Sequence, residues 1–257
     1  MWEARACYAA ATSSLRSLSS LVGCPAVGLA DRPLGLRPAQ RLGVCRTKPR
    51  LASIFVTHLT IEPSILYVGT PVALLSTENE DGTVNLAPMS SAWALGDVVV
   101  LGVGVSGQTA INLRERPDVV INYPSPDQWK AVERLAPLTA AHPVPDHKRA
   151  RFHHEREKFK AAGLTSTPSE LVTPPRVAEC PLQFEATVVH ARLDASGNFL
   201  IAQAEVRRVH AAEHIVVPGT SYVDPAAWSP LIYNFRHYYG LGPELGESFR
   251  TETPRHA

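Results

Sequence analysis

The segment VALLSTENEDGTVNLAPMSSAWALGDVVVLGVGV, residues 72 to 105, decides the fold. Two apolar, β-rich runs flank Asn79-Glu80-Asp81-Gly82, and Asp-Gly between such runs predicts a hairpin. A third, valine-rich run covers residues 97 to 105. A parallel strand pair needs a long crossover connection, whereas these runs are separated only by turns. The segment therefore predicts an antiparallel meander.

The flanking sequence adds helices and then more strands. Ser125-Pro126-Asp127-Gln128 is typical of a helix start, with Ser at the N-cap, Pro at the first helical position and Gln three residues after the cap. Asp194 to Asn198 separates two further strand-like runs. The patterns predict helices over 108–116, from 125 onward and over 147–162, and strands over 118–123, 182–193 and 199–209. Strands, helices and strands in this order predict a mainly β fold with peripheral helices, an antiparallel barrel.

Gly102, Gly104 and Gly107 have the spacing of a dinucleotide-binding fingerprint, G-x-G-x-x-G. A Rossmann site also needs a parallel βαβ unit and an acidic residue at the end of the next strand. Here the next strand ends in Asn122-Tyr123, and the glycine run follows a hairpin. The glycine spacing is therefore interpreted as coincidental, with a Rossmann NAD-dependent dehydrogenase kept as an alternative.

The sequence offers no set of catalytic side chains and no convincing metal site. His210-Ala211-Ala212-Glu213-His214 has the inverted zinc-protease spacing, but it follows directly on a predicted strand rather than lying on a helix. No G-x-S-x-G motif and no C-x-x-C pair occurs, and Cys180 is expected to be a buried apolar residue.

A polar cluster remains where the third strand of the meander meets the following helix. The backbone N–H groups of a helix N-terminus attract anions. Hydroxyl and amide side chains beside it can donate hydrogen bonds to a phosphate. The cluster consists of Ser106, Gln108, Thr109 and Asn112. The alternative interpretation is ordinary turn and capping chemistry.

Composition divides the chain into an N-terminal extension and a body. Residues 1 to 50 hold eight of the 25 Lys and Arg residues but two of the 24 acidic residues. We expect residues 1–55 to be a disordered or non-native extension and residues 56–257 to form the domain. The extension has three interpretations: a wrongly assigned start, an organellar transit segment, or a lipoprotein signal ending at Cys24. The expected location is cytoplasmic, or organellar if the transit interpretation holds. The net charge of +1 and the lack of a long apolar run indicate neither nucleic acid nor a membrane as a partner.

Four segments in order resemble the flavin reductase-like proteins of the FMN-binding split-barrel superfamily. These are PSILYVGTPVALLSTENEDGTVNLAPMSSAWALG, SGQTAINLRE, LVTPPRVAECPLQFEA and PLIYNFRHYYGLGPELGESF. The resemblance runs from about residue 64 to residue 249. It implies a Greek-key split β-barrel, a homodimer, FMN as the cofactor, NAD(P)H as the co-substrate and a small molecule as the acceptor. A non-catalytic FMN-binding protein of the same fold is the alternative.

The resemblance also implies site residues. The NLAPMSSAW segment would line the flavin ring, and SGQTAIN would hold the 5′-phosphate. The expected FMN-binding residues are Ala87, Pro88, Met89, Ser90, Ser91, Ser106, Gln108, Thr109 and Asn112. Related proteins often carry Lys or Arg beside the Thr, where this chain has the neutral Gln108, so Arg114 is a candidate to compensate. The segment Arg236-His237-Tyr238-Tyr239 is expected either to close the pocket or to pack in a dimer.

Overall fold

The computed structural model describes residues 56 to 254. The chain divides into two units, residues 1–59 and 60–257, and every described helix and strand belongs to the second unit. The predicted extension, residues 1–55, lies outside the described residues, so its interpretations stay predictions. No helix in the described part has the length and apolar character needed to cross a bilayer.

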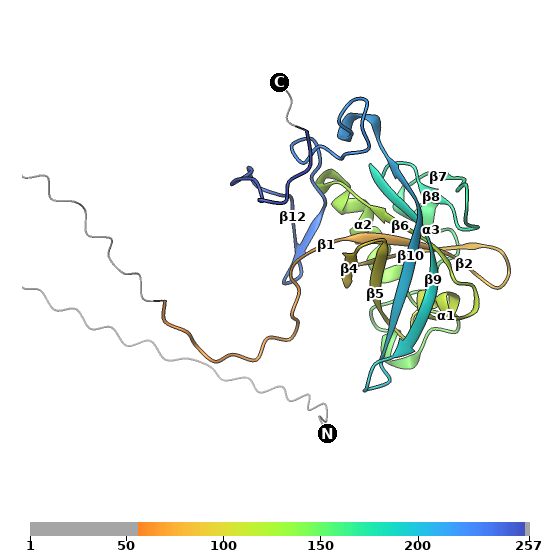
Figure 1. The fold of residues 1–257 in the computed structure, drawn as a ribbon. Coiled ribbons are helices and arrows are strands. Elements are labelled where there is room, and N and C mark those ends of the chain that lie inside the picture. The colour runs from red at the N-terminus through yellow and green to blue at the C-terminus, as the bar shows by residue number, and fades with distance from the viewer. Residues whose placement is uncertain (1–55, 255–257) are drawn as a thin grey trace, which may run out of the picture. The chain divides into compact units, whose positions relative to one another are not determined.

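The described unit is built mainly from strands (Figure 1). The strands are β1 (Val68–Pro71), β2 (Ala73–Glu78), β3 (Val84–Met89), β4 (Ala92–Leu95), β5 (Val98–Gly104), β6 (Asp118–Tyr123), β7 (Ser166–Thr167), β8 (Arg176–Val177), β9 (Leu182–Leu193), β10 (Phe199–Ala211), β11 (Ile232–Asn234) and β12 (His237–Tyr239). The α-helices are α1 (Gln108–Glu115), α2 (Trp129–Leu135) and α3 (Lys158–Ala162). The 3₁₀ turns are η1 (Pro126–Gln128), η2 (Ala136–Leu138), η3 (Asp146–Lys148) and η4 (Glu213–Ile215).

One seven-stranded antiparallel sheet forms the barrel, in the order β3-β2-β6-β9-β10-β5-β4. The long strands β9 and β10 run side by side through it (Figure 1). Its two edge strands, β3 and β4, are consecutive in the chain and separated only by Ser90 and Ser91. The chain thus changes partner at these serines, pairing with β2 before them and with β5 after them. We call this change of partner, at Ser90 and Ser91, the seam.

This topology confirms the predicted mainly β, antiparallel split barrel with peripheral helices, and it excludes the Rossmann alternative. Gly102 and Gly104 lie in β5, which pairs antiparallel with both of its neighbours. Among the described strands every pairing is antiparallel, so no parallel βαβ unit is present. The fingerprint spacing is indeed coincidental.

Apolar residues pack on both faces of β2, which explains why that strand is buried along most of its length. Leu75 belongs to the core inside the barrel, together with Leu101 of β5 and Ile121 of β6. Leu74 points to the other side and packs with Val132 and Leu135 of α2 in a second core. The second core anchors α2 and α3 against the sheet.

The helix expected over residues 147–162 is wrong. The chain forms η3, a turn over 149–151 and then irregular backbone, and only the five residues of α3 are α-helical. Between them the His153 N–H donates to Pro137 O at 2.7 Å, and His154 bridges Thr139. The polar segment has no apolar face to bury as a helix, so tertiary pairing with residues 137–139 overrides its helix propensity.

Candidate cofactor pocket at the barrel seam

A pocket of about 340 Å³ opens at the seam, a size within the usual range for small-molecule sites. Its walls come from strands β2, β3 and β5, the start of α1, the helices α2 and η2 with the adjacent Thr139, and Lys148 of η3. The lining residues are Tyr67, Val72, Leu75, Ala87, Pro88, Met89, Ser90, Ser91, Gly102, Val103, Gly104, Gly107, Thr109, Val132, Ala136, Thr139, Lys148, Tyr233 and Tyr238.

Small residues keep the seam side of the pocket open. The Ser91 hydroxyl is within hydrogen-bond distance, 2.8 Å, of the Tyr67 hydroxyl. A Cβ atom placed on Gly102 would lie 3.4 Å from Ser91 Cβ, while one on Gly104 would meet nothing within 4 Å. A side chain at position 102 would thus only touch Ser91, whereas Gly104 leaves open space at the pocket.

The N-terminus of α1 faces this pocket without a side-chain cap. Gly107 occupies the N-cap position, and no side chain caps the helix. Gly107 and Thr109 both line the pocket. Uncapped N–H groups at the positive end of a helix are suited to bind an anion.

Lys148 adds a positive charge at the same end of the pocket. Its Nζ donates to the carbonyl oxygen of Ser106, directly before Gly107, at 3.2 Å. Burial lowers the pKa of Lys148 from its ordinary value. An ammonium beside a helix N-terminus is repelled by the helix dipole, so an anion between them would relieve this repulsion.

Tyrosines form the opposite wall. The rings of Tyr67 and Tyr233 are 5.7 Å apart, and those of Tyr233 and Tyr238 are 5.4 Å apart. The Tyr238 hydroxyl donates to Glu133 Oε2 at 2.9 Å, and burial together with this carboxylate raises the pKa of Tyr238. Tyr233 and Tyr238 are held by the β11–β12 hairpin, whose turn residues Phe235 and Arg236 both have positive φ. The wall is thus aromatic, built from rings tilted against one another.

The structure brings six of the nine predicted residues into the pocket lining. These are Ala87, Pro88, Met89, Ser90, Ser91 and Thr109. Three others lie outside the lining: Ser106, which meets Lys148 through its backbone, and Gln108 and Asn112, whose side chains bond to each other at 2.8 Å. Arg114 is exposed and does not line the pocket, so Lys148 rather than Arg114 supplies a charge there.

Asn112 has a structural environment. It is fully buried, and its Nδ2 donates to Thr77 Oγ1 at 3.0 Å and to Asn79 Oδ1 at 2.9 Å. Its Oδ1 accepts from Gln108 Nε2 and, at 3.2 Å, from Arg116 Nη2. Every polar atom of this amide is satisfied within the protein, so Asn112 holds α1 against the β2–β3 hairpin.

Sequence reasoning missed Lys148 and the pocket role of Tyr67 and Tyr233. Lys148 follows Thr109 by 39 positions and lies in a polar segment with no recognisable motif. Tyr238 lines the pocket, as one of the two interpretations of residues 236–239 expects. Only knowledge of the tertiary fold brings these residues together.

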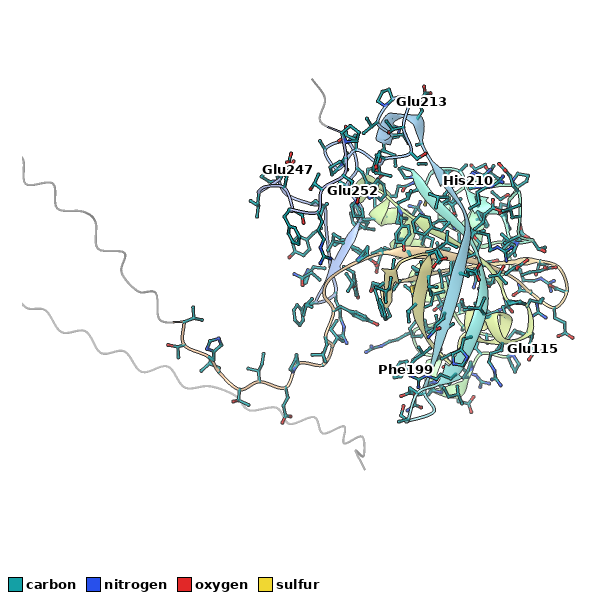
Figure 2. The ribbon with its side chains drawn as sticks, in the orientation of Figure 1. Glu115, Phe199, His210, Glu213, Glu247 and Glu252 are labelled. Atoms are coloured by element: carbon teal, nitrogen blue, oxygen red, sulfur yellow. The ribbon has the colours of Figure 1, made fainter. Side chains whose placement is uncertain are left out.

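The histidine-rich segment 210–214 and Cys180 do not line this pocket. Phe199 and His210 lie near the two ends of β10 (Figure 2), and His210 does not line the pocket. His210 Nε2 pairs with the buried Glu185 carboxylate at 2.8 Å, and Glu213 begins a single 3₁₀ turn. No metal-ligating cluster occurs among the described residues. Cys180 is buried, as expected.

Comparison with known proteins identifies the family. Residues 65 to 242 match the family model described as the flavin reductase like domain. The chain belongs to the flavin reductase like family. Membership supports a flavin-related oxidoreductase that acts on small molecules, and it agrees with the resemblance inferred from the sequence.

The relatives of this flavin reductase like protein match about three quarters of its chain. It is 47% identical over 195 residues to the uncharacterized protein YdfE of Bacillus subtilis (strain 168), covering 75% of this chain and 94% of YdfE. The flavoredoxin of Desulfovibrio vulgaris (Miyazaki F) superposes with a TM-score of 0.63 at 20% identity, over 77% of this chain and all of that chain. A putative flavin reductase with a split barrel domain from Shewanella frigidimarina NCIMB 400 gives a TM-score of 0.58 at 19% identity, over 71% and 87% of the two chains. These two structures support the fold.

The environment of Asn112 generates a prediction about stability. Replacing Asn112 with Ala leaves Thr77, Asn79 and Gln108 without their buried partner. We expect the free energy of unfolding in urea to fall by about 1–3 kcal/mol. Arg114→Ala, an exposed change in the same helix, should stay within about 0.5 kcal/mol of wild type. Equal stability of the two variants would contradict the structural role of Asn112.

Proposed function

We propose that this flavin reductase like protein binds FMN in the seam pocket and is an NAD(P)H-dependent oxidoreductase that reduces flavin or another small acceptor. The observation that carries the proposal is the convergence of the uncapped α1 N-terminus, Thr109 and Lys148 at one end of the pocket. The remaining walls are small, aliphatic or aromatic. This asymmetry matches a ligand with one anionic end and one flat, largely apolar end.

The anionic end fits a phosphate monoester. A hydroxyl, an ammonium and backbone N–H groups are all hydrogen-bond donors, and charge-assisted bonds from Lys are stronger than neutral ones. Lys148 replaces the charge that the neutral Gln108 does not supply. We therefore assign the phosphate to Thr109, Lys148 and the first turn of α1, with Ser106, Gln108 and Asn112 as supporting residues.

The flat end fits an isoalloxazine ring. Ala87 to Ser91 would present small side chains, hydroxyls and backbone to one edge of the ring. Bound FMN would accept a hydride from reduced nicotinamide and pass both electrons to the acceptor. The protein's own part is to orient the ring, exclude water and donate hydrogen bonds to it, which needs no titrating base.

We also propose a homodimer, because one outer face of the barrel is apolar. Outward positions of β4, β5 and β10 would be polar on a sheet facing water. Instead Trp93 and Leu95 are 57% and 72% exposed, and they lie beside Val100 and Val98 on β5. Phe199, labelled in Figure 2, is 56% exposed on β10, which pairs with β5. The exposed apolar side chains that β4 and β5 share are suited to contact with a second copy of the chain.

The function is tested with the purified protein, FMN and both nicotinamide nucleotides. We expect FMN to bind and its oxidised visible absorbance to bleach without oxygen when NADH or NADPH is added. Free FMN with the same nucleotide serves as the control for uncatalysed reduction. Bound FMN that neither nucleotide bleaches would favour the non-catalytic alternative, and a protein that binds no flavin would contradict both.

The assignment of Lys148 predicts a loss specific to the phosphate. Lys148→Gln should weaken FMN binding by about 10- to 100-fold, because hydrogen bonds to charged groups contribute about 1.5–3 kcal/mol. Riboflavin, which lacks the phosphate, should bind the variant as it binds wild type. Fluorescence quenching of each flavin measures both affinities. Arg149→Gln, an adjacent change at a side chain that is 67% exposed, is the control and should change neither. Equal losses for both flavins would refute the assignment.

The apolar face predicts the oligomeric state. We expect wild type to have the mass of a dimer in light scattering. Val100→Glu should shift it toward monomer, since a buried unpaired carboxylate at an interface is costly. Val209→Glu introduces the same charge at a 53% exposed position on the other half of β10 and should leave the dimer intact. A wild-type monomer, or a Val100→Glu dimer, would contradict this proposal.

A further inference from the structure

Lys158 is a buried cation that forms no salt bridge within the described residues. It begins α3, is 3% exposed, and donates from Nζ to Asn85 Oδ1. No carboxylate among the described residues forms an ion pair with it. Burying an unpaired charge costs free energy, so a neutral side chain would serve packing better. The position of this ammonium calls for a role beyond packing.

Lys158 determines which way the Asn85 amide faces. An ammonium can only donate, so the amide oxygen must point toward it. The two amide hydrogens then point away, and Nδ2 donates to Thr77 Oγ1 and to Thr109 Oγ1, each at 3.0 Å. Asn85 is 1% exposed and has no room to exchange with water. The amide oxygen and both amide hydrogens thereby each have a partner.

The Thr109 hydroxyl is left as a donor. It accepts from Asn85, and none of the described residues accepts the hydroxyl hydrogen of Thr109. Thr109 lines the seam pocket. The hydrogen is therefore available to a ligand, and the ammonium, the amide and the hydroxyl are aligned with their positive ends toward the pocket.

We propose that Lys158 is a positioning residue that makes the seam pocket select a phosphorylated flavin over a neutral one, by fixing the Asn85 amide so that Thr109 donates into the pocket. The inference rests on the proposed FMN site and adds to it a residue that does not line the pocket. If Lys158 were absent, the amide could turn over and accept from Thr109, which would remove the donor.

The charge environment of Lys158 gives the inference a pH dependence. Burial lowers the pKa of Lys158 to about 8, with the Glu155 carboxylate opposing this shift. From the elements packed on α3, β3 contributes Asn85, and α2 contributes Arg134, which bonds to Ala162 O at the far end of α3. A bound anion favours the charged ammonium, so FMN affinity should fall as the pH rises through about 8. Lys148 is a second ammonium group at the pocket. The effect of Lys158 is therefore the difference in the pH dependence of FMN affinity between wild type and a Lys158 variant.

The test compares FMN with riboflavin on the full chain by fluorescence quenching. We expect Lys158→Gln to lower the ratio of FMN to riboflavin affinity by about fivefold or more at pH 7, and to flatten its pH dependence near pH 8. Lys158→Arg keeps a charged side chain that can only donate, and should restore most of the ratio. Lys160→Gln, an exposed change in the same helix, should leave the ratio unchanged.

Stability separates this role from a purely structural one. Removing a buried unpaired charge should leave the unfolding midpoint of Lys158→Gln unchanged or raised, while the affinity ratio falls. A folded Lys158→Gln protein with the wild-type ratio and pH profile would overturn the inference and leave the FMN site standing. A wild-type protein that binds neither FMN nor riboflavin would instead overturn the proposed function.

Discussion

The hydrogen bond from the Gly102 N–H to the Ser91 carbonyl oxygen, 2.8 Å long, joins the two halves of the barrel at the seam. It forms where the chain leaves β2 as its partner and takes up β5. One chain segment can pair first with β2 and then with β5 only if its row of backbone hydrogen bonds is interrupted between them. The interruption lies at Ser90 and Ser91. Because side chains are small there, the break leaves a pocket instead of a filled core.

Polar residues behind the pocket connect this seam to the rest of the unit. Thr77 of β2, Asn85 of β3 and Asn112 of α1 are all buried and bonded to one another through side chains. Such a network stabilises only if every member is satisfied. Here each polar side-chain atom of these three residues has a partner inside the protein, and the Thr109 hydroxyl beside them lines the pocket. The same contacts that hold α1 in place therefore also prepare the ligand site.

Local patterns predicted much of the fold. The Asp-Gly turn between β2 and β3, the capping residues Ser125 and Gln128, and the alternating runs of β9 and β10 all act through neighbours in sequence, and the structure has each of them. The short strand β4 was not predicted, although it pairs with β5 through a two-residue turn. The residues of the candidate site likewise divide into those that a local pattern predicts and those that it does not. Thr109 could be predicted from its place at a helix start. Lys148, which lines the pocket, and Lys158, which lies behind it, come from segments with no recognisable motif.

The neutral Gln108 shows why a site is better compared by its charges than by its motif. Judged by the motif alone, Gln108 weakens the case for a phosphate site, since it stands where related proteins often have a cation. In the structure Gln108 is engaged with Asn112, and two lysines from the segment between α2 and β7 provide positive charge from the other side. One contacts the backbone before α1, and the other acts through Asn85. The electrostatic potential at an anion in the pocket is the sum of the contributions of these charges and of the helix dipole. That potential depends on where each charge lies, and not on which element of the chain carries it.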